Sequence, residues 1–197
     1  MTDELSQFAS VVGLDRAAPS RYSALLLLHL YGGQKSGTVD PRRVVHEINA
    51  LEGIGPVSQL KAPIQNKYPP LKGLWHKHYQ QDGLRALALN LGKALKRYGL
   101  PYAQRKVDEG RLTGKLEYFS KGDVMPLVRD ALHNNFVQLG KDAGVSGEWL
   151  LFATYNDKNY YLCLTTHDKS QHFHLRRTID EICCREFPFL PGLLAEA

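Results

Sequence analysis

The sequence has few cysteines and no long hydrophobic run. Two of its three cysteines are the neighbours Cys183 and Cys184, and it contains no Cys-x-x-Cys motif, so a disulfide framework is excluded. Apolar runs such as residues 24–28 are far shorter than the ~18 residues that a membrane-spanning helix needs. The N-terminus begins Met-Thr-Asp-Glu-Leu, which is acidic where a secretory signal is basic. We therefore expect a cytoplasmic protein that does not associate with membranes.

The rest of the composition is that of an ordinary globular protein, with 43% hydrophobic and 23% charged residues. A length of 197 residues suits a single domain over residues 1–197. The alternative is a sub-division into a helical hairpin over residues 1–60 and a basic helix with an antiparallel sheet over residues 61–197.

Positive charge is concentrated in one third of the chain. The segment from Lys61 to Lys121 has 13 Lys and Arg against 4 Asp and Glu, whereas the remaining residues have 12 against 16. Aromatic residues lie within the same segment: Tyr68, Trp75, Tyr79, Tyr98, Tyr102, Tyr118 and Phe119. Cations neutralise phosphates and aromatic faces stack on bases, so this mixture indicates RNA as a partner. The alternatives are a solvated basic surface or one that docks an acidic protein, such as an inhibitor.

Helices are predicted in the first half of the chain. An apolar stretch after Ser20 predicts a short helix that ends at Gly32-Gly33, and Asp40-Pro41 predicts the start of a second helix that ends at Gly53. The clearest helical periodicity covers residues 84–98 and predicts a long amphipathic helix whose other face is basic.

The second half of the chain predicts strands and further helices. Residues 112–119 alternate imperfectly and predict a strand, and Asp123 is expected to cap a helix. Residues 148–155 and 160–167 predict an antiparallel hairpin around the turn at residues 156–159, with its first strand central in the sheet. An apolar stripe from Leu175 to Phe187 predicts a final helix that covers this sheet. The fold class is therefore α+β, in which N-terminal helices and a long basic helix precede a small antiparallel sheet.

Histidines form the most suggestive chemical pattern. His76 and His78 project from one face if their segment is extended, and Pro69-Pro70 favours extended backbone up to Leu74. His167, at the end of the second hairpin strand, is expected at a sheet edge where a cleft opens. Imidazole titrates in the range that both proton transfers of RNA cleavage need. We therefore predict His76, His78 and His167 as catalytic residues; the alternative is that they line a surface while their aromatic neighbours pack in the core.

Basic side chains near these histidines and on the predicted basic helix are candidates for binding substrate phosphates. They are Lys72, Lys77, Arg85, Lys93, Lys96, Arg176 and Arg177.

Two other motifs suggest alternative kinds of site, a zinc site and a phosphate-binding loop. Two His-x-His pairs, one of them at His172 and His174, would suit zinc, but their ligands come from distant segments. The stretch Gly32 to Thr38 has the glycines and the lysine of a phosphate loop, but in the wrong order and after a helix rather than a strand. We therefore predict no metal and no cofactor, and an inter-helix turn at residues 32–38.

The favoured function is a metal-independent ribonuclease, similar in architecture to toxin-like ribonucleases, that cleaves RNA by histidine acid–base catalysis in a basic cleft. That similarity is one of architecture alone. The alternatives are a non-catalytic module that binds nucleic acid or an acidic protein, and a helical interaction protein whose basic face only docks a partner.

Overall fold

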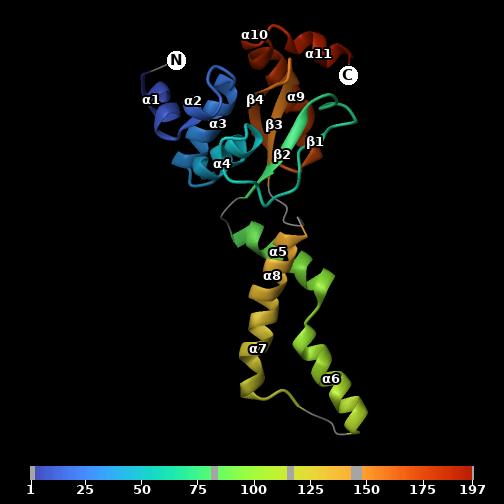
Figure 1. Ribbon diagram of the computed structural model, residues 1–197. Helices are drawn as coiled ribbons and strands as arrows, with labels where there is room; N and C mark the ends of the chain where they lie inside the picture. Colours follow the sequence, from blue (N-terminus) through green and yellow to red (C-terminus); the bar gives the residue numbers. More distant parts are fainter. Residues whose placement is uncertain (1–2, 81–83, 115–117, 143–147, 197) are drawn as a thin grey trace. The chain divides into compact units, whose positions relative to one another are not determined.

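The computed structural model describes residues 3–80, 84–114, 118–142 and 148–196 and has an α+β fold, as predicted (Figure 1). The chain divides into two compact units. The sheet unit comprises Met1–Asp82 and Ser146–Ala197, and the helical unit comprises Gly83–Val145. The segment that follows residue 60 contributes two strands to the same sheet as the C-terminal hairpin.

The sheet unit is built on four antiparallel strands in the order β1-β2-β3-β4. The strands are β1 (Ile64–Gln65), β2 (Trp75–Tyr79), β3 (Glu148–Tyr155) and β4 (Lys158–Thr165). Strand β3 pairs on both sides, which confirms its predicted central position. Asn156 and Asp157 have φ of 48° and 58°, the left-handed conformation that a two-residue type I′ turn requires. Because the turn is this tight, β4 begins two residues before the predicted position.

Four helices precede the sheet: α1 (Asp3–Val11), α2 (Leu14–Ala17), α3 (Ala24–Lys35) and α4 (Pro41–Leu51). Helix α4 starts as predicted, since the Asp40 carboxylate accepts a hydrogen bond from the Arg42 amide. Helix α3 differs from the prediction at both ends. Its N-cap is Ser23, whose hydroxyl accepts from the Leu26 amide, and the helix continues through Gly32 to Lys35.

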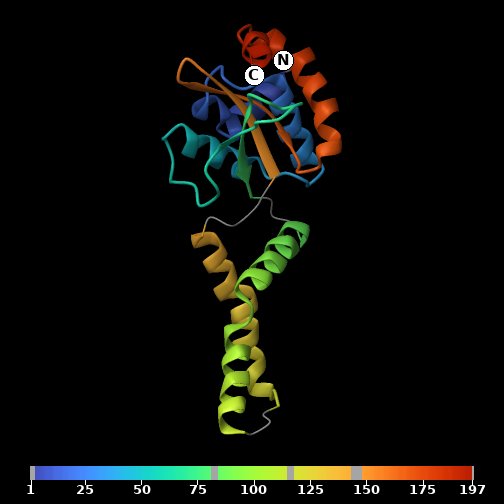
Figure 2. The ribbon, with the colours of Figure 1, turned by 90° about the vertical axis from the view of Figure 1, so that its right-hand side faces the viewer.

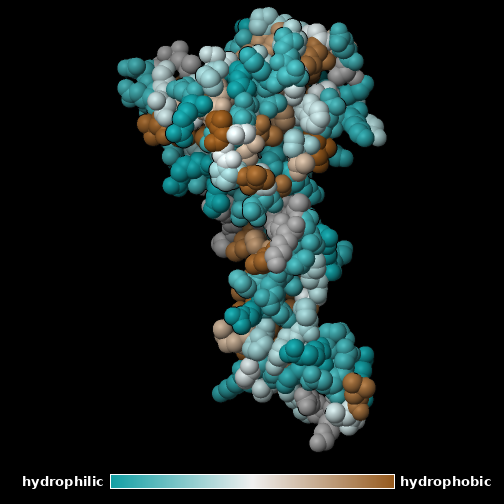
Figure 3. Space-filling model, in the orientation of Figure 1, coloured by the Kyte–Doolittle hydropathy of each residue, from teal (hydrophilic) through white to brown (hydrophobic). Residues whose placement is uncertain are grey.

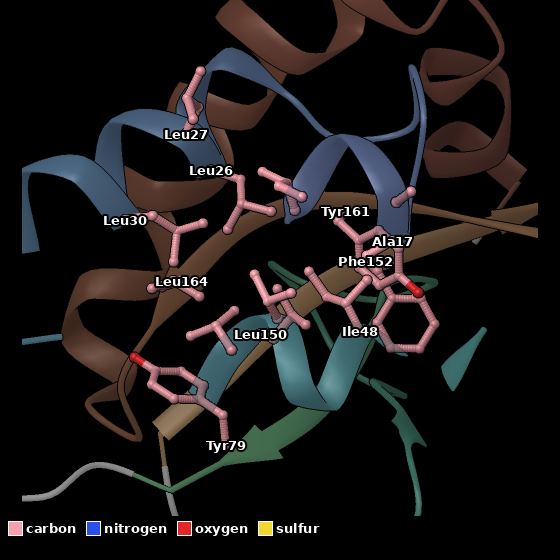
Figure 4. Packing of buried hydrophobic residues seen from close by; sticks show 14 of the residues in the cluster. Ala17, Leu26, Leu27, Leu30, Ile48, Tyr79, Leu150, Phe152, Tyr161 and Leu164 are labelled. Atoms are coloured by element: carbon pink, nitrogen blue, oxygen red, sulfur yellow. The ribbon is translucent and has the colours of Figure 1, made fainter. Parts of the chain in front are cut away.

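The sheet is covered on both faces. Helices α1–α4 pack on one face, and Figure 4 shows side chains of α3 and α4, such as Leu26 and Ile48, against Leu150 and Phe152 of β3. The other face holds Leu151 and Ala153 and is covered by the C-terminal helices. Those helices are α9 (His172–Thr178), α10 (Cys184–Glu186) and α11 (Leu190–Glu196), with a π-helical turn, η4 (Ile179–Cys183), between α9 and α10. The predicted covering helix is thus confirmed.

The helical unit consists of two helical arms (Figure 2). One arm is α5 (Leu84–Tyr98) and α6 (Pro101–Thr113), and the other is α7 (Val124–Val128), the π-helical η2 (Arg129–Asn134) and α8 (Asn135–Lys141). Helix α5 matches its prediction. The strand predicted at residues 112–119 is wrong, because Leu112 lies in α6 and residues 118–119 form no strand; residues 115–117 lie outside the described part.

Buried polar side chains join the two arms. The Asp130 carboxylate accepts a hydrogen bond from the Tyr102 amide at 2.6 Å, and the Asn135 amide donates to the Gly99 carbonyl at 2.7 Å. Both bonds satisfy backbone groups that the break between α5 and α6 leaves without helical partners. Asp123 is expected to cap the helix that follows it, but its side chain makes no cap hydrogen bond to α7. It is instead the third residue of a capping box whose cap is Ser120, directly before α7.

The face of the molecule seen in Figure 3 is largely hydrophilic, with separate apolar patches. Among the described residues, no helix is both long enough and apolar enough to cross a membrane.

One ion pair is buried between α4 and β2. Lys77 Nζ lies 3.2 Å from Glu47 Oε2, and both side chains are at most 5% exposed. Glu47 Oε2 nevertheless receives no hydrogen bond of normal geometry in the described part, whereas Lys77 Nζ donates to Ser58 Oγ and to the carbonyls of Leu60 and Lys61. The carboxylate therefore supplies charge compensation rather than a hydrogen bond.

We expect Glu47→Gln to destabilise the protein by about 3 kcal/mol in urea unfolding at neutral pH, because it leaves the Lys77 ammonium buried without its counter-charge. The matched control is Glu181→Gln at an exposed position, where a change within about 0.5 kcal/mol is expected. Equal stabilities of the two variants would show that the ion pair does not stabilise the fold.

Candidate functional site

Four histidines and one tryptophan gather at one end of the sheet. His76 and His78 lie on β2, whose extended backbone is the condition for the two to share a face, and their ring centroids are 5.4 Å apart. Residues 69–73 before it form turns rather than the extended backbone expected there. The His167 ring, just after β4, lies 5.4 Å from the His78 ring. The three residues predicted as catalytic are therefore brought together from two segments that are far apart in the sequence. They occupy the sheet face that the C-terminal helices cover.

Trp149 of β3 is the centre of this histidine cluster. Its indole stacks on the His76 ring at 4.0 Å and contacts the rings of His167 and His172 at 4.9 and 5.5 Å. Its Nε1–H donates a hydrogen bond to His78 Nε2 at 3.2 Å. One side chain thus positions all four imidazoles. Strand pairing places it there, because Trp149 lies opposite His78 in the register of β2 and β3.

Hydrogen bonds assign the ring proton of His76 and of His78. The Asn66 amide nitrogen donates to the Leu74 carbonyl, so its Oδ1 accepts from His76 Nδ1 at 3.0 Å. Because the ring proton is on Nδ1, His76 Nε2 is the unprotonated nitrogen and has a free lone pair. His78 accepts at Nε2, so its proton is on Nδ1, a buried atom with no hydrogen-bond partner in the described part.

Burial keeps two of these imidazoles neutral. His76 and His78 are 6% and 4% exposed, and desolvation lowers the pKa of His76 to about 4 and that of His78 to about 3. The neighbouring histidines, Lys61 and, for His78, Lys77 reinforce both shifts. His167, in contrast, is exposed. The cluster therefore combines a neutral base, His76, with a solvent-facing imidazole.

Three of the predicted phosphate-binding residues lie in the sheet unit on segments that also contribute to, or lead into, the cluster. Lys72 lies in the segment before β2, and Arg177 lies on α9. Both side chains are exposed. Arg176 is half-buried, and its guanidinium donates to the Pro70 carbonyl at 2.9 Å and pairs with Asp180 at 2.9 Å. Arg176 thus ties α9 to the loop before β2.

The other predicted phosphate-binding residues are not brought to the cluster within the sheet unit. Lys77 points to the opposite sheet face and is buried against Glu47, because side chains alternate along β2. It is not available to a substrate. Arg85, Lys93 and Lys96 belong to α5 of the helical unit, and the Arg85 side chain lies outside the described part.

Sequence reasoning missed the organising roles of Trp149 and Asn66. Trp149 reads as one more apolar residue of a central strand, and Asn66 as part of a long connection. The pairing of His78 with Trp149 is a long-range contact, so no local pattern contains it. Among the described residues, no group of three or more His, Cys, Asp or Glu side chains is arranged to hold a metal ion.

Comparisons with protein-family models, with curated proteins and with solved structures gave no match to this chain. The chemistry of the cluster is therefore argued from its own geometry.

The lowered pKa of His78 predicts a pH-dependent loss of stability. Below pH ~6.5 an unfolded chain protonates His78 but the folded protein does not, so stability is full above that pH and is lost as the pH falls towards about 3. His78→Gln keeps an acceptor for the Trp149 indole and removes the titration. We expect it to lose less stability than the parent protein between pH 6.5 and 4, measured by urea unfolding.

The matched control is His174→Gln, at an exposed position on α9. It should follow the parent protein at every pH. Parallel curves for all three proteins would contradict the assignment of a buried neutral His78.

Proposed function

We propose that the protein is a metal-independent ribonuclease, with His76 as general base and His167 as general acid. The observation that carries the proposal is the meeting of His76, His78 and His167 around Trp149. His76 presents a free Nε2 lone pair and is neutral at pH 7, as a base must be. His167 faces solvent, where a substrate can reach it.

The proposed reaction is a transesterification within the RNA. His76 Nε2 accepts the proton of a ribose 2′-hydroxyl, and the 2′-oxygen attacks the adjacent phosphorus. The bond from phosphorus to the 5′-oxygen breaks, and that oxygen takes a proton from His167. The products are a 2′,3′-cyclic phosphate and a free 5′-hydroxyl, so no water or metal is consumed. His78, whose Nε2 is engaged by Trp149, acts as a positioning residue.

Cations of the sheet unit are assigned to the phosphate. Lys72 and Arg177 are exposed on the segments that flank the cluster, and a phosphorane gains negative charge that such groups stabilise. Lys77 has no part in this, because Glu47 neutralises it on the other face.

Charge segregation supports a second function, nucleic-acid binding by the helical unit. Of the 25 basic and 20 acidic residues of the chain, Gly83–Val145 has 11 and 6, which leaves 14 of each in the sheet unit. The helical unit therefore has the entire net charge of +5, and it exposes Tyr118 at 84% and Phe119 at 55%. Cations with exposed rings suit a single-stranded nucleic acid.

The catalytic proposal is tested with His76→Ala and His167→Ala on single-stranded RNA in the presence of EDTA. Each should lower the cleavage rate by ~10² to 10⁴, since each removes one proton-transfer group. His174→Ala, an exposed histidine outside the cluster, is the matched control and should cleave at the parental rate. The rate should fall as the pH drops through about 4, where His76 becomes protonated. Products should end in a 2′,3′-cyclic phosphate, and a 2′-deoxy nucleotide at the scissile position should block cleavage.

Failure of the highly purified protein to cleave cellular RNA would overturn the ribonuclease proposal. So would full activity in both alanine variants. The binding function of the helical unit would then stand alone, and a charge-reversal experiment decides it.

RNA binding is tested with a charge reversal in each unit. Lys96, Arg111 and Arg129 are exposed in the helical unit, and replacing all three with Glu changes its charge from +5 to −1. We expect weaker RNA binding and a shallower dependence of affinity on salt. The slope of the logarithm of the binding constant against the logarithm of the salt concentration should decrease in magnitude by ~0.7 for each phosphate of a single strand that the variant no longer neutralises. The matched control, Arg16, Lys158 and Arg185 to Glu, makes the same change on the neutral sheet unit. Equal salt dependence in the two triple variants would exclude the helical unit as the binding surface.

A further inference from the structure

A pocket lies in the sheet unit, on the sheet face opposite the histidine cluster. Its volume is about 430 Å³. It opens between the end of α3, the turn that follows this helix, and the adjacent ends of β2, β3 and β4. Tyr79 and Glu148, which pair in the register of β2 and β3, line it, whereas their neighbours His78 and Trp149 face the cluster. Figure 4 shows the Tyr79 ring at the margin of the hydrophobic core. The pocket is therefore separate from the proposed ribonuclease site.

The pocket has an acceptor without a donor. Glu148 Oε2 is buried and has no hydrogen-bond partner among the described residues. The hydroxyls of Ser36 and Thr38 do not supply one, since they bond to each other at 2.8 Å and to the Gly33 carbonyl. A buried carboxylate oxygen without a donor is costly, so a ligand that donates a hydrogen bond to the Glu148 carboxylate would stabilise it.

The remaining polar and apolar walls restrict the chemistry of a ligand. His29 accepts at Nδ1 from the Leu164 amide at 3.2 Å, and burial lowers its pKa, so it is a neutral ring with its proton on Nε2. Leu28, Val39 and Leu164 add apolar surface. The pocket thus suits a molecule with an apolar body and one strong donor.

An anion does not fit this pocket, although its wall contains the glycines of the Gly32–Thr38 stretch. Lys35, the cation of that stretch, lies 3.4 Å from Glu4 and 4.5 Å over the Tyr31 ring, and it does not line the pocket. The ionisable groups among the lining residues are then a carboxylate, a neutral imidazole and a phenol. These groups favour a cationic ligand over a phosphate.

Gly32 keeps the pocket open. It lies inside α3, where glycine costs about 1 kcal/mol relative to alanine, and a Cβ built on it meets no atom within 4 Å. Neither packing nor a left-handed backbone therefore requires glycine here. Gly33 differs, because a Cβ there would meet Val39 at 2.6 Å.

We propose that this pocket binds a small organic amine, with the protonated amine on the Glu148 carboxylate and the apolar body against α3 and β4. The site is independent of the ribonuclease proposal, because it uses the other sheet face and none of the cluster histidines.

The test uses three probes of matched shape on the full chain: phenethylamine, 2-phenylethanol and 3-phenylpropanoate, titrated by calorimetry and ligand-observed NMR at neutral pH. A hydrogen bond to a charged group is worth about 1.5–3 kcal/mol, so the amine should bind at least ~10-fold more tightly than the alcohol, and the carboxylate should not bind. Glu148→Gln should remove the preference for the amine while alcohol binding stays. Gly32→Leu should fill the pocket and abolish binding of both.

The matched control for Gly32→Leu is Gly92→Leu, at another helical glycine whose Cβ would meet no atom within 4 Å. It should bind the amine as the parent protein does. Thermal unfolding checks the fold, and neither leucine variant should melt below the parent protein, because leucine is the better helix former. Equal binding of amine and alcohol, no binding of any probe at millimolar concentration, or unchanged binding in a folded Gly32→Leu variant would each overturn the proposal.

Discussion

The pairing of β2 with β3 is the constraint on which the rest of the sheet unit depends. The two strands join segments separated by the whole helical unit, and their antiparallel register opposes Tyr79 with Glu148 and His78 with Trp149. Because successive side chains alternate between faces and both faces are covered, each of these residues is committed to one environment. A shift of one residue would exchange the contents of the two faces.

Side chains alternate between the two sheet faces along β2, so its neighbouring basic residues lie in different environments. Lys77 enters the face covered by α4, where Glu47 compensates its charge and three oxygens accept its hydrogen bonds. His76 and His78 enter the other face, where no carboxylate is among the groups that shift their titration. Burial therefore leaves the imidazoles neutral, whereas the buried Lys77 ammonium lies beside a carboxylate that compensates its charge.

The two units divide physical tasks. The sheet unit has balanced charge, two apolar clusters and both candidate sites. The helical unit has the net positive charge, few buried side chains and polar contacts such as Asp130 to the Tyr102 amide between its arms. An insertion that binds a polyanion by long-range attraction needs exposed charge more than a large core, so these differences agree with the two proposed functions.

The sequence by itself determined the elements with strong local signals. The α4 start at Asp40-Pro41, the periodic helix α5 and the Asn156-Asp157 turn were predictable because caps, periodicity and left-handed turn residues act over a few positions. The α+β class followed from their order. The strand expected at residues 112–119 failed because its alternation was weak, and because its first two residues, Leu112 and Thr113, form the end of helix α6, which begins at Pro101.

Only the tertiary structure decided the sites. Local spacing could say that His76 and His78 share a face if extended, but not which face, nor that Trp149 and Asn66 would hold them. Local spacing also could not distinguish Lys77 from Lys72. In the structure Lys77 is buried and Lys72 is exposed. The physical reason is that burial and hydrogen bonding depend on strand register between residues more than seventy positions apart, as for His78 and Trp149, which no local pattern encodes.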